Sequence, residues 1–154
     1  MLPQKSNIVI GLRHLSLALL FVLAAMLPVQ AQAKAPERLL LNVTTDSLER
    51  GAMALAFAQA ALRERDAEVV VYLNVDGVRL ANETAARRTF GDNQSLQQML
   101  RDFMKYGGRV LACKLCLERV AGLNDSKLLK GIEVVEPQAV MTLLFRPNVA
   151  VLTY

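Results

Sequence analysis

The chain has 154 residues, with 18 Lys and Arg, 14 Asp and Glu, one His and two Cys. That length fits one ordinary domain, and two cysteines exclude a disulfide-dense scaffold. Residues 1–33 contain two basic side chains, Lys5 and Arg13, and no acidic one. The other 121 residues therefore carry a formal charge of only +2. A nucleic-acid-binding face needs clustered basic residues, so we expect no nucleic-acid partner. The only histidine is His14, which excludes a Ser-His-Asp triad, a Cys-His pair and a His-ligated zinc in the rest of the chain.

The N-terminus resembles a secretory signal peptide. Lys5 and Arg13 precede a 13-residue apolar core, Leu15–Leu27. The Ala-Gln-Ala sequence at 31–33 then supplies the small residues that a signal peptidase recognises. The alternative is an uncleaved membrane anchor. A spanning helix needs about 20 apolar residues, and extending this core backwards would place Arg13 in the bilayer.

We therefore expect residues 1–33 to be a cleaved leader and residues 34–154 to form a single domain. The mature protein would then be periplasmic, in an oxidising compartment. It would contact a membrane only if the leader stayed attached.

The mature chain begins with a strand, a helix and a second strand. The apolar run Arg38–Val43 predicts a buried strand, and Thr44–Gly51 reads as a polar turn. Ala52–Arg65 is rich in Ala, Leu and Met and predicts a helix. Glu68–Val75 is β-branched and nearly continuous, which is typical of a strand covered on both faces, and Asp76-Gly77 ends it.

The middle of the chain contains a loop, a helix and a third strand. Arg79–Gln94 is irregular and predicts a loop with one helical turn. Ser95 and Gln98 have the spacing of a capping box, and the apolar residues that follow lie on one helical face: Leu96, Met99, Leu100, Phe103 and Met104. Gly107-Gly108 closes this helix, and Arg109–Cys113 predicts the third strand.

Two more strands complete the pattern. Leu117–Gly122 and Ser126–Lys130 predict short helical turns, and Ile132–Glu136 predicts the fourth strand. Pro137 suits the first turn of a helix that runs to about Phe145, and Asn148–Tyr154 predicts the fifth strand. Strands that alternate with helices predict a three-layer α/β/α sandwich around a five-stranded parallel sheet.

In an open parallel sheet, ligands bind beyond the carboxyl ends of the strands. The loops expected at that edge carry the carboxylates of Asp46, Glu49 and Asp76, which turn and cap roles explain, and Ser47, which lacks a histidine partner and reads as a helix cap. They contain no glycine-rich phosphate loop. The sequence predicts no cofactor.

The informative group at this edge is Cys113-Lys114-Leu115-Cys116, which follows the third strand. A thiolate is the nucleophilic form of cysteine, and a neighbouring cation such as Lys114 favours it. Two cysteines three positions apart suit a sulfur carrier or a dithiol redox pair, but they also suit an inert bridge or simple packing. A metal site is the weakest interpretation, since structural zinc needs four ligands and this chain offers two thiols.

Three segments of the mature chain resemble the DsrE/DsrF-like family, which includes sulfur-relay subunits. They are RLLLNVTTDSLERGAMALAFAQAAL (38–62), VVVYLNVDGVRLA (69–81) and RVLACKLCLERVAGLNDSKLLKGIEVV (109–135). The first is generic, while the second and third in this order are more specific. The interval from Cys113 to Gly122 is one residue longer than in the usual form of the family.

The resemblance implies a flavodoxin-like fold and a homo-oligomer, a trimer or a hexamer. It also implies that Cys113 accepts sulfane sulfur as a persulfide from a donor protein and passes it to an acceptor, with Lys114 stabilising the thiolate. Cys116 resembles the second cysteine of the family members that carry Cys-x-x-Cys, and would resolve the persulfide. A thiol-disulfide redox protein and a non-catalytic binding module remain the alternatives.

Overall fold

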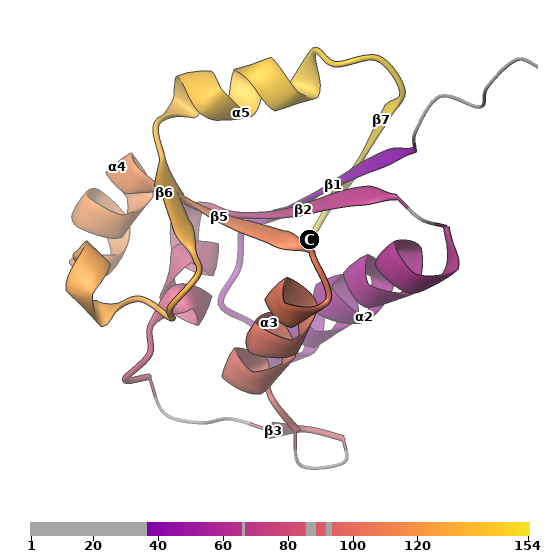
Figure 1. The fold of residues 1–154 in the computed structure, drawn as a ribbon. Coiled ribbons are helices and arrows are strands. Elements are labelled where there is room, and N and C mark those ends of the chain that lie inside the picture. The colour runs from indigo at the N-terminus through magenta and orange to yellow at the C-terminus, as the bar shows by residue number, and fades with distance from the viewer. Residues whose placement is uncertain (1–36, 66, 86–88, 92–93) are drawn as a thin grey trace, which may run out of the picture. The chain divides into compact units, whose positions relative to one another are not determined.

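A five-stranded parallel sheet forms the centre of the computed structural model, which describes residues 37–65, 67–85, 89–91 and 94–154 (Figure 1). In chain order the strands are β1 (Arg38–Val43), β2 (Glu68–Leu73), β5 (Arg109–Cys113), β6 (Glu133–Val135) and β7 (Val149–Thr153). Their order across the sheet is β6-β5-β2-β1-β7, and every neighbouring pair is parallel. The predicted α/β sandwich of flavodoxin-like type is confirmed.

Helices cover the two faces of the sheet unequally. Figure 1 shows α2 (Leu48–Glu64) and α3 (Leu96–Lys105) on one face and α5 (Pro137–Leu144) on the other. From β1 to β6 the chain steps across the sheet in one direction, and it then returns to β7 beside β1. Because crossovers between parallel strands are right-handed, this reversal places α5 on the opposite face. Among the described residues, one helix of 8 residues therefore covers that face.

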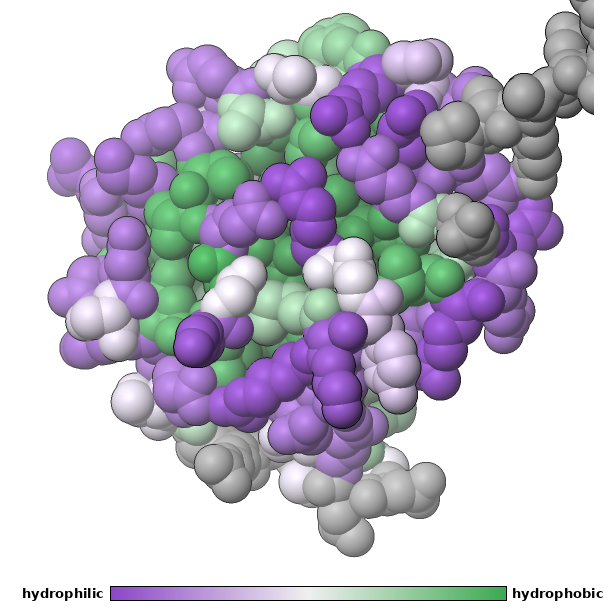
Figure 2. All heavy atoms as spheres, viewed as in Figure 1, coloured by the Kyte–Doolittle hydropathy of each residue, from purple (hydrophilic) through white to green (hydrophobic). Residues whose placement is uncertain are grey.

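The core lies between the sheet and the longer helices. All residues of β2 after its first are buried, as expected for a central strand. Alanines at 52, 54 and 58 of α2 are fully buried and bring the helix close to the sheet, and Phe103 of α3 is also fully buried. Figure 2 shows that hydrophobic residues (green) also reach the surface between hydrophilic ones (purple) on the face in view.

Two element boundaries differ from the sequence prediction. Helix α2 begins at Leu48, inside the predicted turn, because Oγ of Ser47 accepts the N–H of Arg50 at 3.3 Å and caps it. Strand β2 ends at Leu73, two residues early, because Val75 adopts a φ of +47° and opens a 3-10 helix, Val75–Ala81. That positive φ is incompatible with an extended strand.

The segments between the strands are also more regular than predicted. The expected loop at Arg79–Gln94 contains the end of that 3-10 helix and a short hairpin of β3 (Thr89–Phe90) and β4 (Gln94–Ser95). After β5 the chain enters α4 (Lys114–Cys116) at once, continues as a π-helix, Leu117–Ala121, and later forms a 3-10 turn at Asp125–Lys127. A π turn holds more residues than an α turn, and here it ends at Gly122, which adopts the left-handed conformation with φ of +62°.

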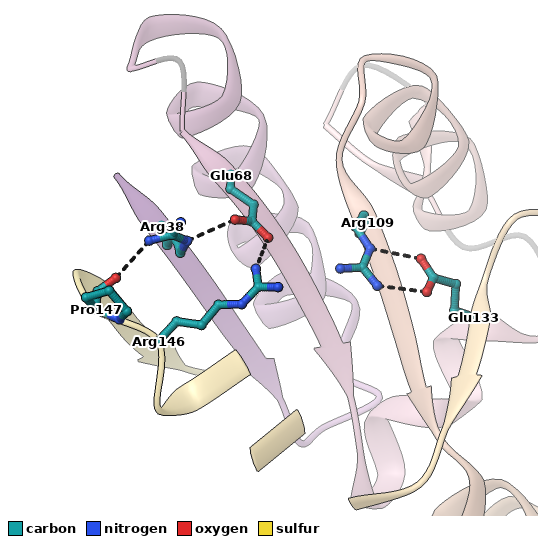
Figure 3. Close-up of polar contacts among 6 residues, drawn as sticks. All are labelled: Arg38, Glu68, Arg109, Glu133, Arg146 and Pro147. Atoms are coloured by element: carbon teal, nitrogen blue, oxygen red, sulfur yellow. Dashed lines mark hydrogen bonds and ion pairs between the residues drawn. The ribbon is translucent and has the colours of Figure 1, made fainter. Parts of the chain in front are cut away.

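Ion pairs join the amino ends of the strands, at the edge opposite the cysteines (Figure 3). The carboxylate of Glu68 on β2 accepts hydrogen bonds from Arg38 on β1 at 3.0 Å and from Arg146 at 2.8 Å. Arg109 on β5 binds Glu133 on β6 in a two-point contact at 3.0 and 2.8 Å. These pairs tie neighbouring strands together at their amino ends.

The predicted leader, residues 1–33, lies outside the described residues, so its fate stays a prediction. In the part of the chain that the structure does describe, none of the helices is long and apolar enough to cross a membrane.

Candidate functional site

The two cysteines lie together where β5 meets α4, at the carboxyl edge of the sheet. Cys113 is the last residue of β5 and the N-cap of α4, and its Sγ accepts the backbone N–H of Cys116 at 3.3 Å. Both are free thiols in this structure. The sequence therefore located the pair correctly, and the fold brings the second residue back over the first.

The two thiols differ in exposure. Cys113 is only 4% exposed and belongs to the hydrophobic core, whereas Cys116 is partly exposed. The expectation that Cys113 meets an incoming reactant assumed a thiol open to solvent, and that assumption is wrong for this conformation. Cys116 is the sulfur that solvent reaches first.

Tyr72 on β2 interacts with the buried sulfur, and its place in an apolar strand gave no sign of this role in the sequence. Burial raises the pKa of the Tyr72 phenol, and its hydrogen bond with Cys113 raises it further. The phenol therefore stays protonated at neutral pH and donates its O–H toward Sγ of Cys113. The N–H of Cys116 approaches the same sulfur from the other element, α4, so Sγ of Cys113 lies between β2 and the first turn of α4.

Burial also raises the pKa of the Cys116 thiol, and its hydrogen bond with Cys113 adds to this effect. The backbone N–H of Val75 opposes the shift by a hydrogen bond to the Cys116 sulfur. Val75 is the β-branched residue with φ of +47°, a conformation that costs about 1–2 kcal/mol for such a side chain. Strained backbone of this kind clusters at functional sites, and here it aims an amide at the accessible thiol.

Lys114 lies between the cysteines in sequence, but its charge is engaged elsewhere. Its Nζ pairs with Oε1 of Glu136 at 2.9 Å, and this hydrogen bond raises the pKa of the Lys114 ammonium. Both side chains are at least half exposed. The predicted role of Lys114 in stabilising a thiolate would require it to leave Glu136.

The other polar residues of this edge have structural partners. Oδ1 of Asp76 pairs with Arg79 at 3.3 Å, and the hydroxyl of Ser47 donates to Glu49 at 2.9 Å while it caps α2. The cap role predicted for Ser47 is confirmed. Across the described residues, no group of three or more His, Cys, Asp and Glu side chains is placed to hold a metal ion.

The comparisons with known proteins agree with this architecture. The model of the DsrE/DsrF-like family matches residues 38–154. The crystal structure of the YchN protein from E. coli superposes with a TM-score of 0.63 at 19% identity, over 78% of this chain and 100% of that one. MTH1491 from Methanobacterium thermoautotrophicum, titled a protein of unknown function, gives 0.63 at 16% identity, over 77% of this chain and 99% of its own. No curated protein is similar enough in sequence to match. Because the family model covers most of the chain, the protein belongs to the DsrE/DsrF-like family.

Proposed function

We propose that this protein is an exported sulfur carrier that holds sulfane sulfur as a cysteine persulfide. The DsrE/DsrF-like family is generally linked to sulfur relay. The observation that carries the proposal for this chain is the pair of free thiols at the carboxyl edge, with Sγ of Cys113 3.3 Å from the N–H of Cys116. Export rests on the leader-like sequence of residues 1–33.

The difference in exposure supports distinct roles for the two sulfurs. Cys116 is the accessible thiol, so its thiolate attacks the outer sulfur of a donor persulfide, forms a Cys116 persulfide and releases the donor thiolate. The thiolate of Cys113 then attacks that outer sulfur, becomes the persulfide and frees the Cys116 thiolate. Tyr72 and the N–H of Cys116 stabilise the charge on the buried sulfur. This order exchanges the roles that the sequence analysis gave to the two cysteines.

Intact-mass analysis after treatment with an organic persulfide tests the proposal. The reduced full-length protein should gain about 32 Da, one sulfur atom, and lose it again to a thiol acceptor. Cys116→Ser should abolish uptake, whereas Cys113→Ser should retain uptake on Cys116 but protect it poorly from reduction. No adduct on freshly reduced protein, or an adduct that neither variant changes, would contradict a carrier function.

A thiol-disulfide redox role is the second candidate, since the same two sulfurs are adjacent. If Cys113 attacks the inner sulfur of a Cys116 persulfide, a disulfide forms and hydrosulfide leaves. A redox titration of the unmodified protein separates the candidates. A potential near those of thiol-disulfide oxidoreductases would favour the redox role, whereas a very low potential would indicate a structural bridge.

We also propose that the protein forms a homo-oligomer through an apolar surface on α2 and β7. Met53 and Phe57 lie four residues apart on α2 and are 45% and 51% exposed, and Leu152 on β7 is 40% exposed. The ring of Tyr154 lies beside Phe57, with centroids 6.5 Å apart. Contiguous exposed apolar residues mark interaction surfaces, and a second copy presents the same surface.

Sedimentation velocity tests this interface. The wild-type protein should sediment as a trimer or hexamer, and Phe57→Glu should shift it to monomer without unfolding it. Phe145→Glu, at an 82% exposed position on the other side of the sheet, is the control and should leave the assembly intact. A monomeric wild-type protein at micromolar concentration would refute the proposed assembly.

A further inference from the structure

In the described part of the chain the five-stranded sheet ends at β6 on one side and at β7 on the other, and these two edges differ. The strand β6 is 3 residues long and carries Glu133, which binds Arg109. The strand β7 is 5 residues long, and its sequence, VAVLT, contains no charged residue and no proline. Short strands, charges and prolines are the usual means by which proteins block an exposed edge. The edge of β7, beside β1 in Figure 1, is therefore open to pairing with a further strand.

The hydrogen bonds between β7 and β1 determine which backbone groups of β7 are unused. The carbonyl of Asn148 accepts the N–H of Arg38 at 3.2 Å, and the N–H of Tyr154 donates to the carbonyl of Asn42 at 2.9 Å. In a parallel pair, alternate residues of a strand bond to the same neighbour, so the even-numbered residues of this strand face β1. The odd-numbered residues direct their backbone N–H and C=O groups away from the sheet: Val149, Val151 and Thr153.

These outward residues are arranged symmetrically about Val151, which makes the edge complementary to itself. When a second copy of β7 runs antiparallel to the first, Val151 lies opposite Val151 of the second copy, and Val149 lies opposite Thr153. Residues paired in this way exchange both of their backbone hydrogen bonds, about six across the whole contact. A second copy therefore uses every outward backbone group of the strand.

The side chains on both faces of the edge also favour a second copy. On one face, Val151 adjoins Met141 of α5, and both are half-exposed. On the other face, Leu152 and the ring pair of Phe57 and Tyr154 belong to the apolar surface proposed above for self-association. A twofold axis through Val151 places each apolar patch beside its own copy, so the contact buries apolar side chains on both faces of the sheet.

We propose that two copies of this chain join by antiparallel pairing of their β7 strands, which makes one continuous sheet through the dimer. The inference rests on the homo-oligomer proposed above and names its contact. A twofold contact builds assemblies with an even number of copies, so it selects the hexamer over the trimer. Because the strands of the two copies run in opposite directions, their thiol pairs lie at opposite edges of the joined sheet.

Introduced cysteines test the register of the paired strands. The two copies of residue 151 lie about 5.5 Å apart between Cα atoms in this geometry, a distance that a disulfide spans. Val149→Cys is the matched control, since its two copies are about four positions out of register and lie about 14 Å apart. After mild oxidation, Val151→Cys should be bridged between copies at least about tenfold more than Val149→Cys. A mixture of Val149→Cys and Thr153→Cys chains should be bridged between unlike chains.

Peptide mass spectrometry identifies each bridge, so the native cysteines stay in place. A proline variant then tests the hydrogen bonds. Val151→Pro removes an outward N–H and no bond to β1, which an edge strand tolerates, whereas Val151→Ile keeps the N–H and is the control. In sedimentation velocity, Val151→Pro should fall to about half the wild-type mass or less, and Val151→Ile should not change. Circular dichroism verifies folding, and the introduced cysteines decide if the proline variant does not fold.

The outcomes separate this inference from the proposals on which it rests. Equal bridging of Val149→Cys and Val151→Cys, or a folded Val151→Pro that keeps the wild-type mass, would refute the β7 pairing and leave the homo-oligomer standing. A wild-type trimer, which has no twofold axis, would do the same. A monomeric wild-type protein would refute both. Persulfide uptake tests the carrier function independently of all these results.

Discussion

Gly77 lies against the end of β1 so closely that a Cβ on Gly77 would stand 2.1 Å from the carbonyl oxygen of Val43. That oxygen belongs to the backbone, and it also accepts the N–H of Asn74 at 3.0 Å. The contact therefore anchors the segment after β2, including Val75, which presents its amide to Cys116. Only glycine permits this approach.

Gly77→Ala should destabilise the protein by about 3 kcal/mol or more, because backbone cannot turn aside as a flexible side chain can. Gly107→Ala is the control: Gly107 has a φ of +95° and open space around it, so only the backbone conformation is penalised, by about 1–2 kcal/mol. Urea unfolding of both variants measures the difference. Equal losses would show that the segment moves away from β1 at little cost.

The accessible thiol should react before the buried one. With iodoacetamide at limiting concentration, Cys116 should be alkylated at least about tenfold faster than the 4% exposed Cys113. Peptide mass spectrometry after partial reaction gives both rates in one sample. Faster labelling of Cys113 would indicate that α4 opens readily, and would restore the role that the sequence analysis gave to Cys113.

The reaction rate of Cys116 should depend strongly on pH. Its pKa is raised by burial, so the thiol remains protonated at neutral pH and the thiolate fraction grows about tenfold per pH unit below the pKa. In the Cys113→Ser variant, the rate at which Cys116 is alkylated should rise without a plateau between about pH 6 and about pH 9. A plateau near neutral pH would mean that the Val75 amide outweighs burial.

Replacing Val75 should relieve strain. Val75→Asn keeps the backbone amide that faces Cys116, and asparagine tolerates a positive φ far better than a β-branched residue. Asn148, with φ of +60°, shows that this chain already uses asparagine in that conformation. We expect a gain of about 1 kcal/mol in the free energy of unfolding, with Val78→Asn, a buried position, as a destabilising contrast. A loss of stability in Val75→Asn would show that the valine side chain contributes packing larger than the strain.

The Arg109–Glu133 pair should make stability depend on pH. The hydrogen bond from Arg109 lowers the pKa of Glu133 below its ordinary value, so the pair stabilises the fold above the unfolded-state pKa, and this contribution is lost as the pH falls through the folded-state pKa. Both side chains are more than a third exposed, so Glu133→Gln should cost only about 0.5 kcal/mol at neutral pH.

Thermal unfolding across acid pH checks this expectation. The difference between wild type and Glu133→Gln should vanish in acid, where Glu133 is protonated in both states. Glu64→Gln, at the exposed end of α2, is the control. A difference that persisted unchanged in acid would mean that packing, and not charge, holds this contact.

Local sequence patterns were sufficient for most of the fold. The strands Arg38–Val43 and Arg109–Cys113 were predicted with the bounds that the structure has. Each is a short apolar run between polar residues, a pattern that favours a buried strand. The Ser95 cap was also recognised, and its Oγ accepts the N–H of Gln98 at 3.2 Å. The start of α2 was missed because Thr44–Gly51 is polar enough to read as a turn, although Ser47 caps a helix there.

The candidate site was likewise predicted in part from the sequence. The sequence by itself determined the succession of helices and strands along the chain, the α/β class and the position of two thiols after the third strand. These features follow from periodicity and spacing. Only the tertiary structure decided which sulfur is buried, that Tyr72 and Val75 influence the pKa values of this site, and that Lys114 binds Glu136. Exposure and hydrogen-bond partners depend on side chains that are distant in the chain and meet only when β2, β5 and β6 assemble into one sheet.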